Sequence, residues 1–333
     1  MKSREIALNT TNEAEKQIKQ LVEEDKVARF NYSEEIAEIF DEYISSDFLS
    51  KLNLFFHQYT ELAGITHRNN LSEVGIFFSL DPSMPHVAIY SPLTNSISIK
   101  LTWFLQKKEV FSRVMMEMLV IHLIIHELVH SQGKVFAMSD DRFGATEFVN
   151  DLGIFTRVVK QKNENLHVGN YGFYGMNEAM TDLISFLIMK KVVKDSDEFF
   201  SYLNSYFTKD VSKNYSPYVY ILIELIKRLS LEKQVSTDEV TIELVEFYFG
   251  KYGFYSDEFQ NLVISTFGED GYEDLTNLHL SGLNKLSGNK DSNFTKEDIS
   301  SSDGIDFVDK HLGKTGEMVT EEAIDFIKNC NAS

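Results

Sequence analysis

Residues 109–132 have the sequence EVFSRVMMEMLVIHLIIHELVHSQ, and this segment is the strongest helix prediction in the chain. Its centre, from Met115 to Ile125, is apolar on almost every side. A helix of this kind is buried, because a helix at the protein surface needs a polar face. Gly133 follows directly and is a suitable C-terminal cap, since glycine accepts the left-handed backbone conformation found there. We therefore expect a buried helix that ends near residue 132.

Near the C-terminal end of this helix, His126, Glu127 and His130 form an HExxH pattern. Residues four positions apart lie on one helix face, so the two histidines can bind the same metal ion. Glu127 lies about 100° further round the helix, close enough to bind a water molecule on that metal. Burying three such groups in an apolar helix is costly unless they have a specific partner. The pattern therefore predicts a zinc site with Glu127 as general base.

A second motif, NEAMTD, lies at residues 177–182 and is also predicted to be helical. Glu178 and Asp182 are four residues apart and share one helix face. Glu178 can be the third zinc ligand, which leaves the fourth position open for water. Asp182 can accept a hydrogen bond from the ligand histidine on the side away from the metal, which would fix the orientation of that ring.

The HELVH and NEAMTD motifs together resemble those of the gluzincins, the thermolysin-like zinc metallopeptidases. The resemblance covers these two short segments directly, and the order of elements agrees more loosely over residues 86–190. The interval between the motifs is longer than in thermolysin, which indicates an insertion or a different subfamily. The ends of the chain show no such resemblance. The resemblance implies zinc binding at His126, His130 and Glu178. It also implies general-base catalysis at Glu127 and support of a ligand histidine by Asp182.

The family also uses a tyrosine or a histidine to stabilise the oxyanion that forms during hydrolysis. Tyr171 and Tyr174 lie just before the second motif on a loop with several glycines. Tyr215 and Tyr218 precede the next strong helix and are alternatives, as is His167. For each of these residues an ordinary packing role is also open.

His122 lies four residues before His126, so that three histidines form one row on the helix. The outer two, His122 and His130, lie about 12 Å apart along the axis at about 1.5 Å per residue. That distance is too long for one metal ion to bind all three. We interpret His122 as a buried core residue or as a group that supports a metal ligand.

The predicted fold class is α+β, with a zincin-like core in which a small, mostly antiparallel sheet packs on the HExxH helix. Short strands are expected at residues 74–80 and 86–90. Residues 96–101 alternate between polar and apolar, which is typical of a half-buried strand. By the family resemblance, an extended peptide would add to the edge strand of the sheet. Our candidate for that edge is the strand at 96–101.

The length of 333 residues suggests more than one packed unit. We expect a helical N-terminal region at 1–70 and the catalytic core at 71–195. A helical subdomain at 196–280 is expected to form the other wall of a cleft. Residues 281–333 are expected to be a linker, rich in Ser, Gly, Asn and Asp, followed by a terminal helix.

Charge and composition restrict the classes of partner. The formal net charge is −19, and no dense cluster of Lys or Arg is present, which disfavours nucleic acid and membrane surfaces. The single cysteine, Cys330, excludes an intramolecular disulfide. No signal peptide or membrane-spanning stretch is recognised, so the expected location is the cytoplasm, with export by a route without a cleaved signal left open. The expected partner is a peptide or protein substrate, and the negative charge could attract a basic one.

The sequence thus predicts a zinc metallopeptidase and leaves two alternatives. An aminopeptidase or another amide hydrolase could use the same zinc site, although an exopeptidase needs an acidic anchor for the free amine. A non-catalytic zinc-binding module would need a fourth protein ligand. No clear motif supplies either feature. The choice between endopeptidase and exopeptidase and the oligomeric state stay open.

Overall fold

The computed structural model describes most of the chain between residue 74 and the C-terminus. Beyond Ala7–Asn9 and residues 52–54, the N-terminal region expected to be helical lies outside the described residues. The described residues are 7–9, 52–54, 74–79, 81, 84, 86–91, 95–132, 135–140, 145–150, 156–157, 160–162, 165–167, 171–172, 174–193, 196–208, 216–249, 257–288, 307–313 and 316–331.

The chain forms two compact units. The first contains residues 1–152 and 188–198, and the second contains residues 153–187 and 199–333. Helix α6 (Tyr174–Val192) contributes residues to both, because the division falls inside this one helix. The domain boundaries expected from the sequence remain a prediction.

A three-stranded sheet in the first unit comprises β2 (Gly75–Ser79), β3 (Ala88–Ser91) and β4 (Ser96–Lys100). The strand order is β2-β4-β3, and β4 pairs parallel with β2 and antiparallel with β3. The strand expected at the edge is therefore the central one, and the edge strands are β2 and β3. Ser96 and Ser98 are buried together with Ile97 and Ile99, so the alternation of serine and isoleucine does not mark a solvated face.

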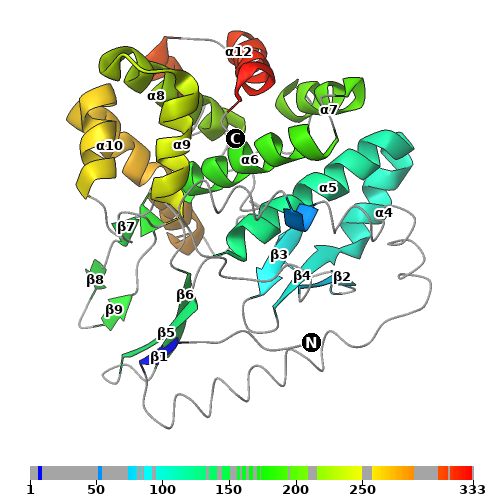
Figure 1. The fold of residues 1–333 in the computed structure, drawn as a ribbon. Coiled ribbons are helices and arrows are strands. Elements are labelled where there is room, and N and C mark those ends of the chain that lie inside the picture. The colour runs from blue at the N-terminus through cyan, green and yellow to red at the C-terminus, as the bar shows by residue number, and fades with distance from the viewer. Residues whose placement is uncertain are drawn as a thin grey trace. The chain divides into compact units, whose positions relative to one another are not determined.

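Two helices follow the sheet in place of the single helix expected over 109–132. They are α4 (Leu101–Val110) and α5 (Arg113–His130). Ser112 separates them with an extended backbone, and its Oγ accepts a hydrogen bond from the Met115 N–H at 3.3 Å. This side chain is an N-cap, which satisfies a donor that the first helical turn leaves without a partner. Figure 1 shows α5 lying across β3 and β4, with which it is in contact.

The remaining strands form short pairings within each unit. In the first unit, β5 pairs parallel with β1 and antiparallel with β6. In the second unit, two antiparallel pairs join β7 to β10 and β8 to β9. The bounds are β1 (Ala7–Asn9), β5 (Val135–Asp140), β6 (Ala145–Asn150), β7 (Thr156–Arg157), β8 (Lys160–Lys162), β9 (Asn165–His167) and β10 (Tyr171–Gly172).

Helix α8 is the central element of the second unit. It contacts α9, α10 and α12, and every side chain from Pro217 to Ile226 is buried. A helix that is apolar on all sides is stable only when other elements surround it, which agrees with these contacts. The helical elements that follow α6 are α7 (Asp197–Thr208), α8 (Ser216–Lys233), α9 (Thr237–Tyr248), α10 (Asp257–Gly288), the short π-helix η2 (Val308–Leu312) and α12 (Gly316–Asn329).

Helix α10 extends into the segment that was expected to be a linker. It has a break in its helical backbone at Gly268 (φ 77°, ψ 175°) and continues to Gly288. The expected linker began at residue 281, so its first part is helical. Leu280, Leu283 and Leu286 recur every three residues, a spacing that supports a helix despite the surrounding Ser, Gly and Asn.

The fold is α+β in the general sense, with helices predominating among the described residues and several small sheets beside them. A search of the described helices for one with the length and apolar character of a membrane span found none.

Candidate metal centre

The HExxH residues lie in the last turns of α5, and all three belong to the first unit. His126 and Glu127 are buried, and His130 is partly buried. The Nε2 atoms of His126 and His130 lie 3.2 Å apart, and the two rings meet edge to face with centroids 4.9 Å apart. This geometry follows from the spacing of four residues, which places both rings on one helix face.

Helix α6 carries the second motif. Glu178 and Asp182 are buried and lie four residues apart. One potential ligand atom from each of His126, His130 and Glu178 lies within 4.8 Å of the other two. These are the three ligands expected from the sequence.

The three side chains fit the requirements of a zinc ion. Zinc bonds to histidine nitrogen and carboxylate oxygen are about 2.0–2.2 Å long, so ligand atoms in a tetrahedral site lie about 3.3–3.6 Å apart. The 3.2 Å between the two histidine nitrogens is close to that value. The set of two neutral imidazoles and one carboxylate is also the donor set of catalytic zinc sites, in which a fourth position is open.

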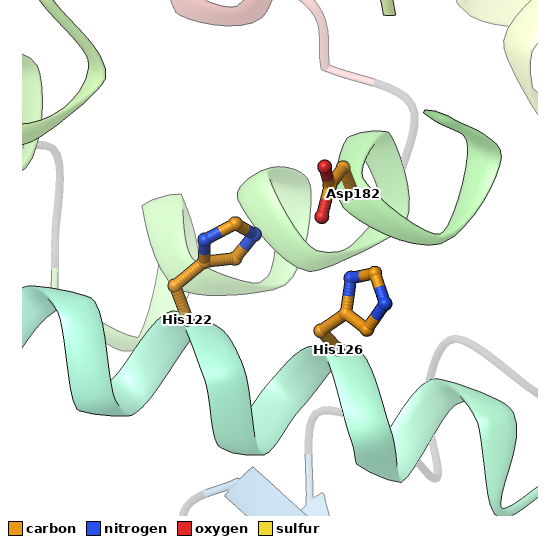
Figure 2. Close-up of side chains that lie close together, drawn as sticks. All are labelled: His122, His126 and Asp182. Carbon is orange, nitrogen blue, oxygen red and sulfur yellow. The ribbon is translucent and has the colours of Figure 1, made fainter. Parts of the chain in front are cut away.

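A second group of side chains shares His126. Figure 2 shows His122 and His126 on α5 with Asp182 on α6, and potential ligand atoms of these three residues also lie within 4.8 Å of one another. The Nε2 atom of His126 faces His130, so its Nδ1 atom is the one available to the Asp182 carboxylate. A histidine can bind a metal through one nitrogen and donate a hydrogen bond through the other. His122, which is buried, lies in this second group and not among the three ligands.

Glu127 is held by the sheet on which α5 packs. Its Oε2 accepts a hydrogen bond from the backbone N–H of Tyr90 at 2.7 Å. Tyr90 lies in the edge strand β3, opposite Ile97 of β4. Along two antiparallel strands, residues that hydrogen-bond to the neighbouring strand alternate with residues that do not. The Lys100 N–H donates to the Val87 carbonyl, so Val87 is a residue that bonds across to the neighbouring strand, and Tyr90, three positions later, is one that does not. The Tyr90 N–H therefore points away from β4, so Glu127 lies beside the outer edge of β3, which is an edge strand of the described sheet.

Asp182 is surrounded by side chains of α7 that the sequence did not single out. The Tyr206 hydroxyl donates a hydrogen bond to Asp182 Oδ2. Tyr202 lies one turn earlier on α7, and burial, followed by the charge of Asp182, raises the pKa of its phenol well above the ordinary value. The only local signal in the sequence is the spacing of these tyrosines, four residues apart on a predicted helix.

The neighbouring polar groups of α6 are also satisfied internally. The Thr181 hydroxyl donates to the Asn177 carbonyl at 3.0 Å and lies 2.8 Å from the Tyr248 hydroxyl of α9. The Ser185 hydroxyl donates to the Thr181 carbonyl at 2.7 Å. These bonds allow α6 to be buried on all sides without leaving its hydroxyl groups unsatisfied.

Among the candidate oxyanion donors, Tyr218 is the one whose side chain the structure describes. It is buried on α8, and its ring lies against Gly175, three residues before Glu178. A Cβ atom at Gly175 would come within 2.4 Å of the Tyr218 ring, so glycine permits this approach. Tyr215 and the side chains of Tyr171, Tyr174 and His167 lie outside the described part of the molecule.

No protein-family model matches the chain, and no curated protein or solved structure matches it either.

Proposed function

We propose that the chain is a zinc-dependent metallopeptidase. The observation that carries the proposal is the grouping of His126, His130 and Glu178, whose potential ligand atoms lie within 4.8 Å of one another. Two further features support it. The three residues occur in the two motifs that resemble the gluzincins, and all three belong to helices whose other residues are largely apolar and buried. We place the site within a zincin-like core.

The three ligands have distinct tasks in this proposal. Each histidine binds through Nε2, and Glu178 contributes a carboxylate oxygen. When bound, the zinc ion would polarise the peptide carbonyl and lower the pKa of a water molecule toward about 7. The single negative charge of Glu178 leaves the site with a net positive charge that favours a developing oxyanion.

Glu127 is the proposed general base. It accepts a proton from water and passes that proton to the amine that leaves when the peptide bond breaks. Its hydrogen bond to the Tyr90 N–H fixes one carboxylate oxygen, so the other, Oε1, is the one that takes the proton. Among the candidate oxyanion donors whose side chains the structure describes, we choose Tyr218, because its ring lies against Gly175, three residues before Glu178.

The outer edge of β3 is the proposed binding surface for an extended peptide, in place of the strand 96–101. An edge strand can hydrogen-bond an added strand, and β3 lies at the edge of the described sheet β2-β4-β3, beside Glu127. A peptide bound there would place its backbone next to the general base.

Zinc content of purified protein tests the proposal, with Glu178→Gln as the key variant. We expect about one zinc per chain in the wild type and much less in the variant, because an amide is a poor zinc ligand. Glu224→Gln is the matched control, since Glu224 is also a buried carboxylate on an apolar helix. It should keep the wild-type zinc content.

Two results would overturn the proposed site. One is a wild-type protein that takes up no zinc even after reconstitution, and the other is full zinc content in Glu178→Gln.

Hydrolysis of peptides with blocked and with free amino termini then separates an endopeptidase from an aminopeptidase. A zinc-containing protein with four protein ligands and no hydrolytic activity would favour the non-catalytic module.

A further inference from the structure

The contact between Tyr206 and Asp182 has no role in the site as proposed so far. Both residues are buried, with 2% of each exposed, and both belong to the second unit. The Tyr206 hydroxyl donates to Asp182 Oδ2. A hydrogen bond to a carboxylate is short and strong when it is shielded from water, so this contact is a strong constraint on the carboxylate.

The Tyr206 ring is itself held in place. It meets the Phe186 ring of α6 edge to face with centroids 4.9 Å apart, and the Phe207 ring in the same way at 5.0 Å. Edge-to-face contacts of this kind restrict the orientation of a ring. The hydroxyl therefore approaches Asp182 from a fixed direction and cannot easily follow a rotation of the carboxylate.

The two oxygens of Asp182 can thus serve two different partners. Oδ2 accepts from Tyr206, which leaves Oδ1 to accept an N–H from a histidine. Asp182 has such neighbours, because it groups with His122 and His126. Carboxylates that orient a metal-binding histidine act well only when they are themselves hydrogen-bonded.

We propose that Tyr206 is a positioning residue of the metal centre, which holds Asp182 in the orientation needed to support His126. This inference rests on the proposed zinc site. It assigns Tyr206 no contact with substrate or metal, because its effect passes through Asp182. The other reading of the same contact is that Tyr206 only stabilises the packing of α7 against α6.

Tyr206→Phe tests the inference, and Tyr248→Phe is its matched control. Each variant removes one hydroxyl from a fully buried tyrosine that bonds to α6, at Asp182 in one case and at the adjacent Thr181 in the other. The readouts are the zinc dissociation constant, by competition with a chelator, and the visible absorption spectrum of the cobalt(II)-substituted protein. Unfolding of the metal-free proteins records the structural cost of each change.

We expect Tyr206→Phe to weaken zinc binding by about tenfold, at the lower end of the range for residues beyond the metal ligands. Its cobalt spectrum should change, because the histidine is held less firmly. Tyr248→Phe should change zinc affinity by less than about twofold and leave the spectrum as in the wild type, although its metal-free form is destabilised to a similar extent. Asp182→Asn should weaken zinc binding at least as much as Tyr206→Phe.

The double variant shows whether Tyr206 acts through Asp182. In the Asp182→Asn background, Tyr206→Phe should cause little further loss of zinc affinity, since coupled residues are not additive. Equal losses in both backgrounds, or equal losses in Tyr206→Phe and Tyr248→Phe, would overturn the inference. If Tyr206→Phe does not fold, wild-type zinc affinity in Asp182→Asn would overturn it. If the wild type binds zinc and Tyr206→Phe binds it with the same affinity, only this inference is overturned. If the wild type binds no zinc, the proposed function is overturned as well.

Discussion

Helices α5 and α8 are each 18 residues long and are buried on almost every side, yet they contain polar residues of different kinds. On α8 the buried carboxylate of Glu224 has a lysine partner one turn away, at 3.1 Å from Lys227. On α5 two histidines and Glu127 occupy consecutive turns at one end, and Glu127 bonds to a backbone N–H of the sheet.

The difference shows what burial alone requires. A central helix needs apolar side chains and a local partner for any charge, and α8 satisfies this need within its own turn. Helix α5 instead concentrates groups that bind cations and protons. Departures from a simple packing rule are expected where a protein has a functional site. Changes at His126, Glu127 and His130 of α5 should therefore affect chemistry, whereas changes at the apolar core residues of α8, Tyr218 excepted, should affect stability.

The largest expected effect is that of Glu127→Gln on hydrolysis. We expect the turnover of a peptide substrate to fall by about 10³-fold, within the usual range for loss of a general base, with zinc content unchanged. Glu117→Gln on the same helix is the control, because Glu117 is partly exposed and forms an ion pair with Arg113. Steady-state kinetics together with metal content measure both. Retained turnover in Glu127→Gln would exclude Glu127 as the base.

The next effect concerns the stability of α8. Leu222 is fully buried, so Leu222→Ala should lower the free energy of unfolding by about 3 kcal/mol, as expected for a core leucine. Leu231→Ala on the same helix should change it by less than about 0.5 kcal/mol, since Leu231 is 80% exposed. Urea unfolding provides both values. Both variants should keep their zinc, and a folded Leu222→Ala without zinc would contradict the division of roles between the helices.

The smallest effect concerns the ion pairs of Lys227, which contacts the carboxylates of both Glu224 and Glu322. Lys227→Met keeps the aliphatic stem but removes the ammonium group, and should destabilise the protein by about 1 kcal/mol because Glu224 stays buried. The side chain of Lys227 is 32% exposed, so solvent screens part of the interaction. Lys233→Met is the control, since Lys233 and its partner Glu243 are both about one-third exposed. Equal losses in urea unfolding would show that burial of Glu224 does not matter.

The parts of the site that could be predicted from sequence are those that depend on local spacing. The pairs His126 and His130, and Glu178 and Asp182, are each four residues apart, and helical geometry alone places them on shared faces. The break at Ser112 is also local and could have been predicted, because serine is a strong N-cap.

The remaining features depend on contacts between distant segments. The order β2-β4-β3 inserts the last strand between two earlier ones, and no local pattern specifies that choice. Tyr206 is one of 15 tyrosines in the chain, and only the packing of α7 against α6 brings it to Asp182. Tyr218 was one of several candidates, and its contact with Gly175 joins two residues 43 positions apart in the sequence.

The hydrogen bond that holds Glu127 has a consequence for mutational studies. Its donor belongs to the main chain of Tyr90, so every amino acid except proline can supply it. Tyr90→Ala would keep this N–H, so its effect would report only the loss of the buried ring and of the hydrogen bond from the Tyr90 hydroxyl to Asn95. Proline scanning along β3, or exchange of single amides for esters, is the approach that would detect this contribution.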